Sequence, residues 1–246
     1  MRPLTTTELL DVWEQGSRRS LLQRSLLLLQ VACAFPDAGT VARFSIGERD
    51  ARLLKLREWM FGDRFVNTAN CPQCGEQIEW TVPIEDLRLQ PWSRQEGSPT
   101  FTLQDGGYEV RFRLPNSEDM ALIASLPAYQ PDPGKLLADC ILRASHHGEE
   151  CSPDTLPAAL LEAINQRMAA EDPQADIRMV LSCPQCACTW EAPFHILSYL
   201  WTEIDAWARR ILQEVYLLAR AFSWSEQDIL NLSPYRRQLY LEMIRS

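Results

Sequence analysis

The motif Cys-Pro-Gln-Cys occurs twice in this chain of 246 residues, once at Cys71–Cys74 and again at Cys183–Cys186. Each copy runs into a short segment in which polar and apolar residues alternate around a tryptophan, EQIEWTV in the first case and CTWEAPF in the second. Such alternation predicts β-strands. A thiol pair in a tight turn between two strands is typical of one half of a zinc ribbon. We therefore expect the two copies to meet in the fold, with the residues between them as an insertion.

The ligands of that site would be the sulfur atoms of Cys71, Cys74, Cys183 and Cys186. Four converging thiolates form the tetrahedral, soft shell that Zn²⁺ prefers, so the pattern predicts one structural zinc ion per chain. Iron fits the same shell and stays open as a substitute. A disulfide or redox pair is the other interpretation of a CxxC motif, but the context is not thioredoxin-like. Four thiolates leave no position for a water ligand, which argues against a catalytic metal.

The second motif differs from the first just after its last cysteine. Cys74 is followed by Gly75, whose lack of a side chain suits the backbone of a tight turn, whereas Cys186 is followed by Ala187. Cys188 then adds a fifth thiol close to the site. It could compete with Cys186 as a ligand or pack beside the metal, and we expect the second arrangement.

The remaining candidates for chemistry are weak. Cys33 and Cys140 lie among apolar residues of predicted helices and are expected to be core thiols, while Cys151 lies in a polar loop. His146-His147 stands beside acidic residues in that loop, SHHGEECSP, but two adjacent histidines on a regular element cannot both face one ligand. The sequence has no Ser-His-Asp grouping, phosphate-binding glycine loop or HExxH motif. We predict a protein without enzymatic activity.

Charge argues against nucleic acid as the ligand. The formal net charge is −9, and residues 71–192, which hold both thiol pairs, carry eight basic and nineteen acidic side chains. Proteins that bind DNA or RNA normally present a basic surface that displaces counterions from phosphates. The N-terminus MRPLTTTELL lacks the profile of a secretory signal, which predicts a reducing compartment, where CxxC pairs favour metal over disulfides. The most apolar run, LLLLQVACAF, is about half as long as the roughly 20 residues of a membrane helix.

The rest of the sequence predicts a mostly helical α+β fold, with a zinc-ribbon-like β element split by a long α/β insertion. Capping signatures at Thr5-x-x-Glu8 and Ser45-x-x-Glu48 open two helices. A hairpin is predicted across Asp105-Gly106-Gly107. Further helices are expected over about 133–144 and 154–171, and an apolar stripe from near Phe194 predicts a helix of about seven turns. We divide the chain into an N-terminal helical region (1–66), two ribbon halves (67–87 and 177–193), an insertion (88–176) and a C-terminal helical region (194–246).

Several segments together resemble a known family. They are CPQCGEQIEW, CPQCACTWEA, RFRLPNSEDM, AEDPQADIRM and, above all, the C-terminal stretch WSEQDILNLSPYRRQLYLEMI. In these segments the chain is similar to the T4-type baseplate hub assembly chaperone family, which is found in contractile-tailed phages and in phage-tail-like injection systems. The resemblance runs through most of the chain, and its main departures are Ala187 and Cys188.

This resemblance implies a chaperone or adaptor that helps to build the baseplate hub through protein–protein contacts, in the bacterial cytoplasm where tails assemble. Its partners would be hub or other tail proteins, with neither nucleic acid nor membrane among them. One alternative is a permanent baseplate subunit that is retained in the tail particle. The alternative from another class is a zinc-ribbon regulator that binds nucleic acid.

The C-terminal segment SPYRRQLYLEMI offers a candidate docking patch. Ser233-Pro234 predicts the start of a short helix. We expect this helix to present Tyr235, Arg236 and Arg237 to solvent, while the apolar residues after them face inward or toward a partner. Aromatic and arginine side chains are frequent anchors of protein interfaces. The competing interpretation is a helix that only covers the end of the long helix before it.

Overall fold

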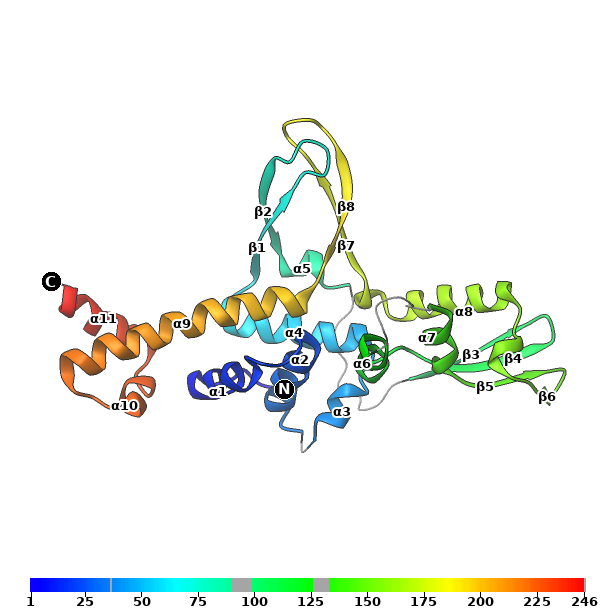
Figure 1. Cartoon of the computed structure of the whole chain (residues 1–246), viewed down its shortest axis with the longest axis horizontal. Helices are drawn as coiled ribbons and strands as arrows, with labels where there is room; N and C mark the ends of the chain where they lie inside the picture. The colour runs from blue at the N-terminus through cyan, green and yellow to red at the C-terminus, as the bar shows by residue number, and fades with distance from the viewer. Residues whose placement is uncertain (36, 90–98, 126–132, 246) are drawn as a thin grey trace. The chain divides into compact units, whose positions relative to one another are not determined.

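The computed structural model describes residues 1–35, 37–89, 99–125 and 133–245. The chain forms two compact units, one made of Met1–Cys33 with Leu197–Ser246 and the other of Ala34–Ile196 (Figure 1). Within the described residues helices dominate and the strands form three small antiparallel sheets, which confirms the predicted α+β class. Both predicted ribbon halves and the predicted insertion fall in the second unit. None of the described helices is long and apolar enough to cross a membrane.

The first unit is helical and contains the long helix that the apolar stripe predicts. Its first helix begins at the expected capping box, in which the Thr5 hydroxyl accepts from the N–H of Glu8 and the Glu8 carboxylate accepts from the N–H of Thr5. A second capping box joins Ser225 and Asp228. The helices of this unit are α1 (Thr6–Gly16), α2 (Leu21–Cys33), α9 (Ile196–Phe222), α10 (Glu226–Leu230) and α11 (Pro234–Arg245).

Apolar contacts hold the short helices of the first unit on α9. Leu10 of α1 and Leu230 of α10 share a buried cluster with Ala208 and Ile211 of α9. A second cluster farther along α9 joins it to α10 and α11 through Leu218, Ile229 and Leu241. Because burial of a leucine or isoleucine side chain contributes about 1.5–3 kcal/mol, these clusters are the main source of stability for α10, which is too short to be stable alone.

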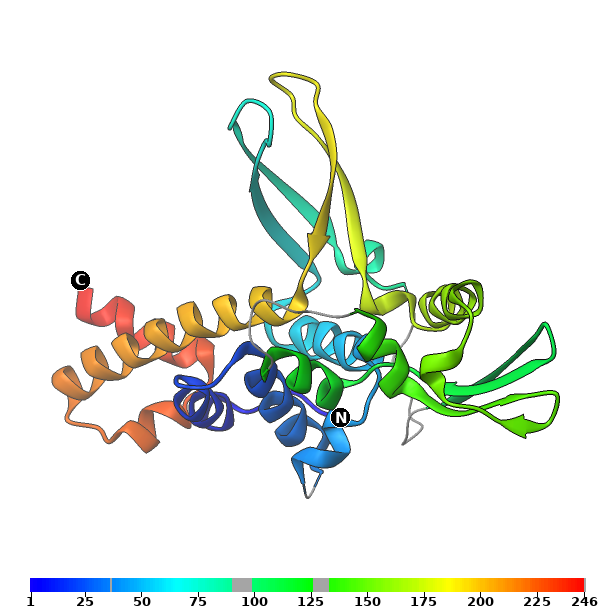
Figure 2. The ribbon, with the colours of Figure 1, turned by 45° about the vertical axis from the view of Figure 1, so that its right-hand side comes forward.

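The second unit contains two β-hairpins that are far apart in sequence. β1 (Arg64–Asn70) pairs with β2 (Gln77–Pro83), and β7 (Ile177–Ser182) pairs with β8 (Thr189–Phe194), both antiparallel. The hairpins lie side by side, each as a separate two-stranded sheet (Figure 1, Figure 2). The helices of this unit are α3 (Ala38–Ala42), α4 (Ile46–Phe61), α5 (Ile84–Leu87), α6 (Ser117–Ser125), α7 (Pro133–Cys140) and α8 (Ala158–Glu171), with 3₁₀ turns at Pro153–Thr155 and Pro173–Ala175.

The insertion between the hairpins has a sheet and a core of its own. Its four strands are ordered β3-β4-β5-β6. Val110 and Phe112 of β4 pack with Leu160 and Ile164 of α8 in one buried cluster. The hairpin predicted at Asp105-Gly106-Gly107 is present, with Asp105 paired to Tyr108. The strands are β3 (Thr100–Asp105), β4 (Tyr108–Arg113), β5 (Ile141–His146) and β6 (Glu149–Glu150).

The predicted helix over about 133–144 is wrong in its second half. α7 ends at Cys140, and the chain continues directly as β5, with Ile141 and Ala144 buried. β4 offers backbone hydrogen-bonding groups that need a partner, and β5 supplies it, so sheet pairing outweighs the helical preference of this segment. The helix predicted from 154 begins later, at Ala158, after a 3₁₀ turn.

The segment predicted as an exposed loop, SHHGEECSP, is in part a tight hairpin. His147 and Gly148 link β5 to β6 and both have positive φ, +51° and +87°. Positive φ at both central residues is the signature of a type I′ turn, which matches the right-handed twist of paired strands. His146 lies on β5, where its ring stacks on that of Tyr108 with centroids 4.1 Å apart.

Helix α4 buries several charged side chains. Arg49 donates to the carboxylate of Asp50 at 2.7 Å and to the hydroxyl of Ser117 at 3.2 Å. Burial raises the pKa of Asp50, and the charge of Arg49 opposes that shift. Arg52 pairs with Glu48 one turn earlier, at 2.8 Å. Each of these charges has a partner, as buried charges require.

A group of hydrogen bonds joins the segment that follows the first hairpin to the segment that precedes the second. We call this group the return clamp (Gly47, Leu87, Leu89, Asp172 and Gln174). The Asp172 carboxylate accepts from the N–H of Gly47, at the start of α4, at 2.9 Å. The fully buried Gln174 side chain donates to the carbonyl of Leu87 at 2.9 Å and accepts from the N–H of Leu89 at 2.8 Å. The clamp therefore holds the two ends of the insertion next to each other.

Candidate metal centre

The four predicted thiols lie in two turns with the same backbone geometry. In the first turn, Cys71 N–H donates to the carbonyl of Glu76 at 2.8 Å, and Gly75 N–H donates to the carbonyl of Cys71 at 2.9 Å. In the second, Cys183 N–H donates to the carbonyl of Cys188 at 2.8 Å, and Ala187 N–H donates to the carbonyl of Cys183 at 2.9 Å. Each turn closes the end of one hairpin and presents its two sulfur atoms on one side.

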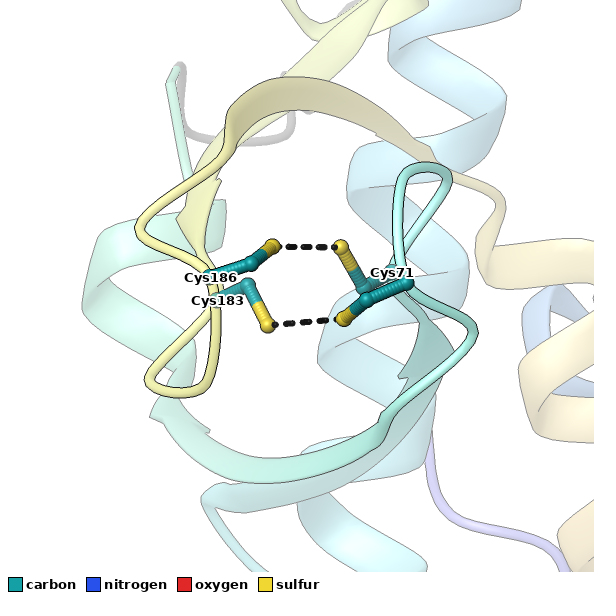
Figure 3. A group of neighbouring side chains, drawn as sticks. Cys71, Cys183 and Cys186 are labelled. Carbon is teal, nitrogen blue, oxygen red and sulfur yellow. Dashed lines mark hydrogen bonds between the residues drawn. The ribbon is translucent and has the colours of Figure 1, made fainter.

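The two turns bring their sulfur atoms together (Figure 3). The Sγ atoms of Cys71 and Cys186 are 3.6 Å apart, as are those of Cys74 and Cys183, and all four lie within 4.8 Å of one another. A disulfide needs about 2.05 Å. Four sulfurs at about 2.3 Å from one ion, in a tetrahedron, would be about 3.8 Å apart. The spacing therefore fits a bound metal ion, and all eight cysteines of the chain are free thiols.

The electrostatics of the group also fits a cation. Burial disfavours the thiolate of Cys71, but the backbone N–H groups of Cys74 and Gln73 donate to its sulfur and lower its pKa to about 6. The N–H of Glu76 favours the thiolate of Cys74, but burial and the neighbouring thiols together raise its pKa to about 12. One thiolate thus makes the next harder to form. A divalent cation would offset this repulsion between thiolates, because its charge stabilises several of them at once.

The two hairpins present apolar faces to support the group. In all four strands the less exposed residues alternate with exposed ones, so each hairpin has one covered face. The rings of Phe65 and Phe194 meet edge to face with centroids 5.6 Å apart. The guanidinium of Arg57, on α4, lies 3.9 Å from the centroid of Phe65. Residues of β1, β8 and α4 therefore pack together at the base of the hairpins, and the sulfur atoms lie at the tips.

Cys188 lies beside this group but outside it. The four cysteines predicted as ligands form the group of neighbouring metal-ligand atoms found in the described part of the chain, and Cys188 does not belong to it. It occupies the place that Glu76 has in the first turn. Burial raises the pKa of the Cys188 thiol, and the charge of Cys71 raises it further.

The unusual residue of the second turn gives a stability prediction. Ala187 has φ +57°, where the equivalent Gly75 has φ +76°. A side chain in this left-handed region costs about 1–2 kcal/mol of strain. Glycine removes that strain but loses about 0.5–1 kcal/mol more than alanine in backbone entropy on folding. Ala187→Gly is therefore expected to raise the free energy of unfolding by about 0.5–1 kcal/mol, measured by urea denaturation of the metal-loaded protein.

The reverse substitution is the matched test. A Cβ on Gly75 would meet no atom within 4 Å, so Gly75→Ala changes backbone strain without a steric clash. We expect it to destabilise the protein by a similar amount. Equal effects of the two substitutions, in the same direction, would contradict the proposed equivalence of the turns.

The other predicted residues lie elsewhere. Cys140 is buried in the core of the insertion, where burial raises the pKa of its thiol to about 11. Cys151 packs, half-buried, against the same core, and Cys33 is also half-buried. The rings of His146 and His147 are in tilted contact, with centroids 4.3 Å apart, and belong to no group of metal-ligand side chains in the described part of the chain.

The predicted docking residues do not share one face. Tyr235 is 74% exposed and Arg236 is exposed, but the prediction that Arg237 faces solvent is wrong, because this residue is only 3% exposed. Arg237 donates to the carboxylate of Glu214 at 3.2 Å and to the carbonyl of Leu232 at 3.2 Å. It thus holds α11 on α9, and this face of α11 is covered. A docking role for Tyr235 and Arg236 stays a prediction.

Comparison with known proteins extends these observations. No curated protein and no solved structure matches the chain. The family described as T4 bacteriophage base plate protein matches residues 6–196. This range includes both hairpins, all four clustered cysteines and the return clamp, and it ends where α9 begins. The C-terminal stretch on which the sequence resemblance rests most strongly lies outside it. By this match over most of its length, the chain belongs to the T4 bacteriophage base plate protein family.

Proposed function

We propose that this protein is a non-enzymatic assembly chaperone or adaptor for the baseplate hub of a contractile phage tail or phage-tail-like injection system. The observation that carries the proposal is the family match over residues 6–196. The partners would be hub or other tail proteins, and the place of action would be the bacterial cytoplasm, where tails are assembled.

The thiol group supports a structural metal within this function. We infer that Cys71, Cys74, Cys183 and Cys186 hold one zinc ion, with iron as a substitute that depends on supply. Four protein ligands fill a tetrahedral shell, so such an ion would link the hairpins and would not activate water. Its role would be to fix two distant parts of the chain against each other.

Exposed apolar side chains support action by protein contact. On α11, Tyr235, Leu239 and Met243 recur every four residues and are 74%, 38% and 64% exposed. Residues at that spacing line one face of a helix. An exposed apolar face is typical of a surface that a partner covers. A nucleic-acid regulator is disfavoured by the net charge of −9.

Whether the protein remains in the finished tail tests the proposal. We expect the gene deletion to abolish complete baseplates. The protein should accompany hub components in lysates of cells that assemble tails, and quantitative mass spectrometry of purified tails should find it far below one copy per hub. Stoichiometric retention in washed, mature tails would contradict a chaperone and indicate a permanent subunit. Normal tails from the deletion strain would contradict both.

A further inference from the structure

A groove in the first unit is lined by residues of three helices, α1, α9 and α10, which Figure 1 labels. Its volume is about 470 Å³. The chemistry of its walls differs between bottom and edge. Its floor is apolar, with Leu10, Trp13, Leu212 and Leu230, and its edge is acidic, with Asp11, Glu14 and Glu226.

The floor of the groove is a fixed surface. Leu10 and Leu230 belong to the buried cluster that joins the three helices, and Trp13 packs against that cluster. The indole N–H of Trp13 donates to the carboxylate of Asp205 at 2.9 Å, which fixes the ring. Leu212 is 39% exposed and so offers apolar surface that the fold itself leaves uncovered. An apolar group entering the groove would gain contacts at little cost in ordering the protein.

The three acidic side chains at the edge have no basic partner. Within the described residues, Asp11, Glu14 and Glu226 make no side-chain hydrogen bond or ion pair, and no lysine or arginine lines the groove. Other acidic side chains of the same unit are paired. Glu8 pairs with Arg2, Asp205 with Arg209 and Glu214 with Arg237.

A second hollow that Trp13 also lines has a different charge pattern. Its volume is about 390 Å³, and it is lined by Arg24 and Arg209 together with Asp205. There the protein supplies its own cations. In the first groove, the three carboxylates are exposed and have no basic neighbour along the lining, so basic side chains of a partner can reach them.

We propose that this groove binds an amphipathic segment of a partner protein, in which apolar side chains cover Leu212 and Trp13 and arginine or lysine side chains pair with Asp11, Glu14 and Glu226. Apolar side chains of the partner would be buried against the floor, and the carboxylates would favour a partner with basic side chains over one with acidic side chains. Arginine and lysine suit this shape, because their stems lie on apolar surface while their charged ends reach the edge. The inference does not depend on the baseplate role.

Calorimetric titration of the full-length, metal-loaded protein tests the proposal. The probe is a synthetic amphipathic helical peptide in which arginines flank a stripe of leucines, compared with a peptide that has glutamates in place of the arginines. We expect the arginine peptide to bind and the glutamate peptide not to bind. The triple variant Asp11→Asn, Glu14→Gln, Glu226→Gln should weaken binding about tenfold, since each exposed ion pair contributes a factor of about two to five. Leu212→Ser should weaken it as well.

The matched control removes the same charge elsewhere. Glu79→Gln, Glu85→Gln and Asp86→Asn change three exposed carboxylates on β2 and α5, outside the groove. This variant should bind the arginine peptide as the unchanged protein does. Failure of the arginine peptide to bind, equal binding of the glutamate peptide, or equal weakening by the control variant would each overturn the proposal. Circular dichroism of every variant confirms that it is folded.

Discussion

Replacing Cys71 with serine is expected to release the metal and to unfold the paired hairpins. Cys71 is buried at the tip of the first hairpin, and its sulfur lies 3.6 Å from that of Cys186 on the second. Apparent binding free energies of structural zinc sites in small peptides are about 10–16 kcal/mol. Even part of that amount is comparable with the whole stability of an ordinary domain, about 5–15 kcal/mol. Elemental analysis should therefore find a metal-free variant, and its urea midpoint should fall steeply.

Cys188→Ser is the control for the cysteine prediction. Cys188 lies next to the group but is not one of its four members, so this variant should keep its metal and its urea midpoint. If Cys188→Ser lost the metal while Cys186→Ser retained it, the ligand assignment would be wrong. Elemental analysis of the unchanged protein that found neither zinc nor iron would end the idea of a metal centre.

Gln174→Leu should clearly destabilise the second unit, although Gln174 lies away from the sulfur atoms. Leucine has about the same size, but it leaves the buried carbonyl of Leu87 and the partly buried N–H of Leu89 without the partner that Gln174 provides. A buried polar group that loses its hydrogen bond costs about 1–3 kcal/mol. We expect a loss of about that size in the free energy of unfolding, mostly from the Leu87 carbonyl, because water can reach the N–H of Leu89. Hydrogen exchange should show the loss spreading to both hairpins, since the clamp lies at the base of each.

Gln166→Leu is the matched substitution on the surface. Gln166 is exposed on α8, and its side-chain amide bonds only to the carboxylate of Glu162, at 2.9 Å. Exposed substitutions of this kind usually change stability by less than about 0.5 kcal/mol. If Gln174→Leu cost no more than Gln166→Leu, the return clamp would contribute nothing to the stability of the unit.

The parts of the fold that sequence predicts well are those with a local physical signal. The capping box at Thr5 and the cap at Ser45 are formed by side chains that accept from backbone N–H groups three residues away, so the sequence alone is enough to predict them. The thiol pairs are also local, because each CPQC turn forms its own half of the group. Their meeting could be inferred only because the second copy repeats the first.

The parts that sequence does not predict depend on distant partners. The sequence ILRASH is compatible with the end of a helix and with a strand. It becomes a strand because it pairs with β4. Arg237 resembles any helical arginine until Glu214 is placed beside it. The roles of Asp172 and Gln174 have no local signature either, because their partners lie 125 and 87 residues away.

The return clamp also bears on how this family can diversify. Leu89 and Gln174 are hydrogen-bonded to each other, so the ends of the intervening segment lie together whatever that segment contains. Extending a loop whose ends are fixed is inexpensive, since each doubling of its length costs only about 0.6 kcal/mol. Recombination can therefore exchange, shorten or enlarge the loops of this segment while the return clamp stays in place. We expect relatives to diverge fastest here, and new partner preferences to evolve in this segment while the cysteine turns stay the same.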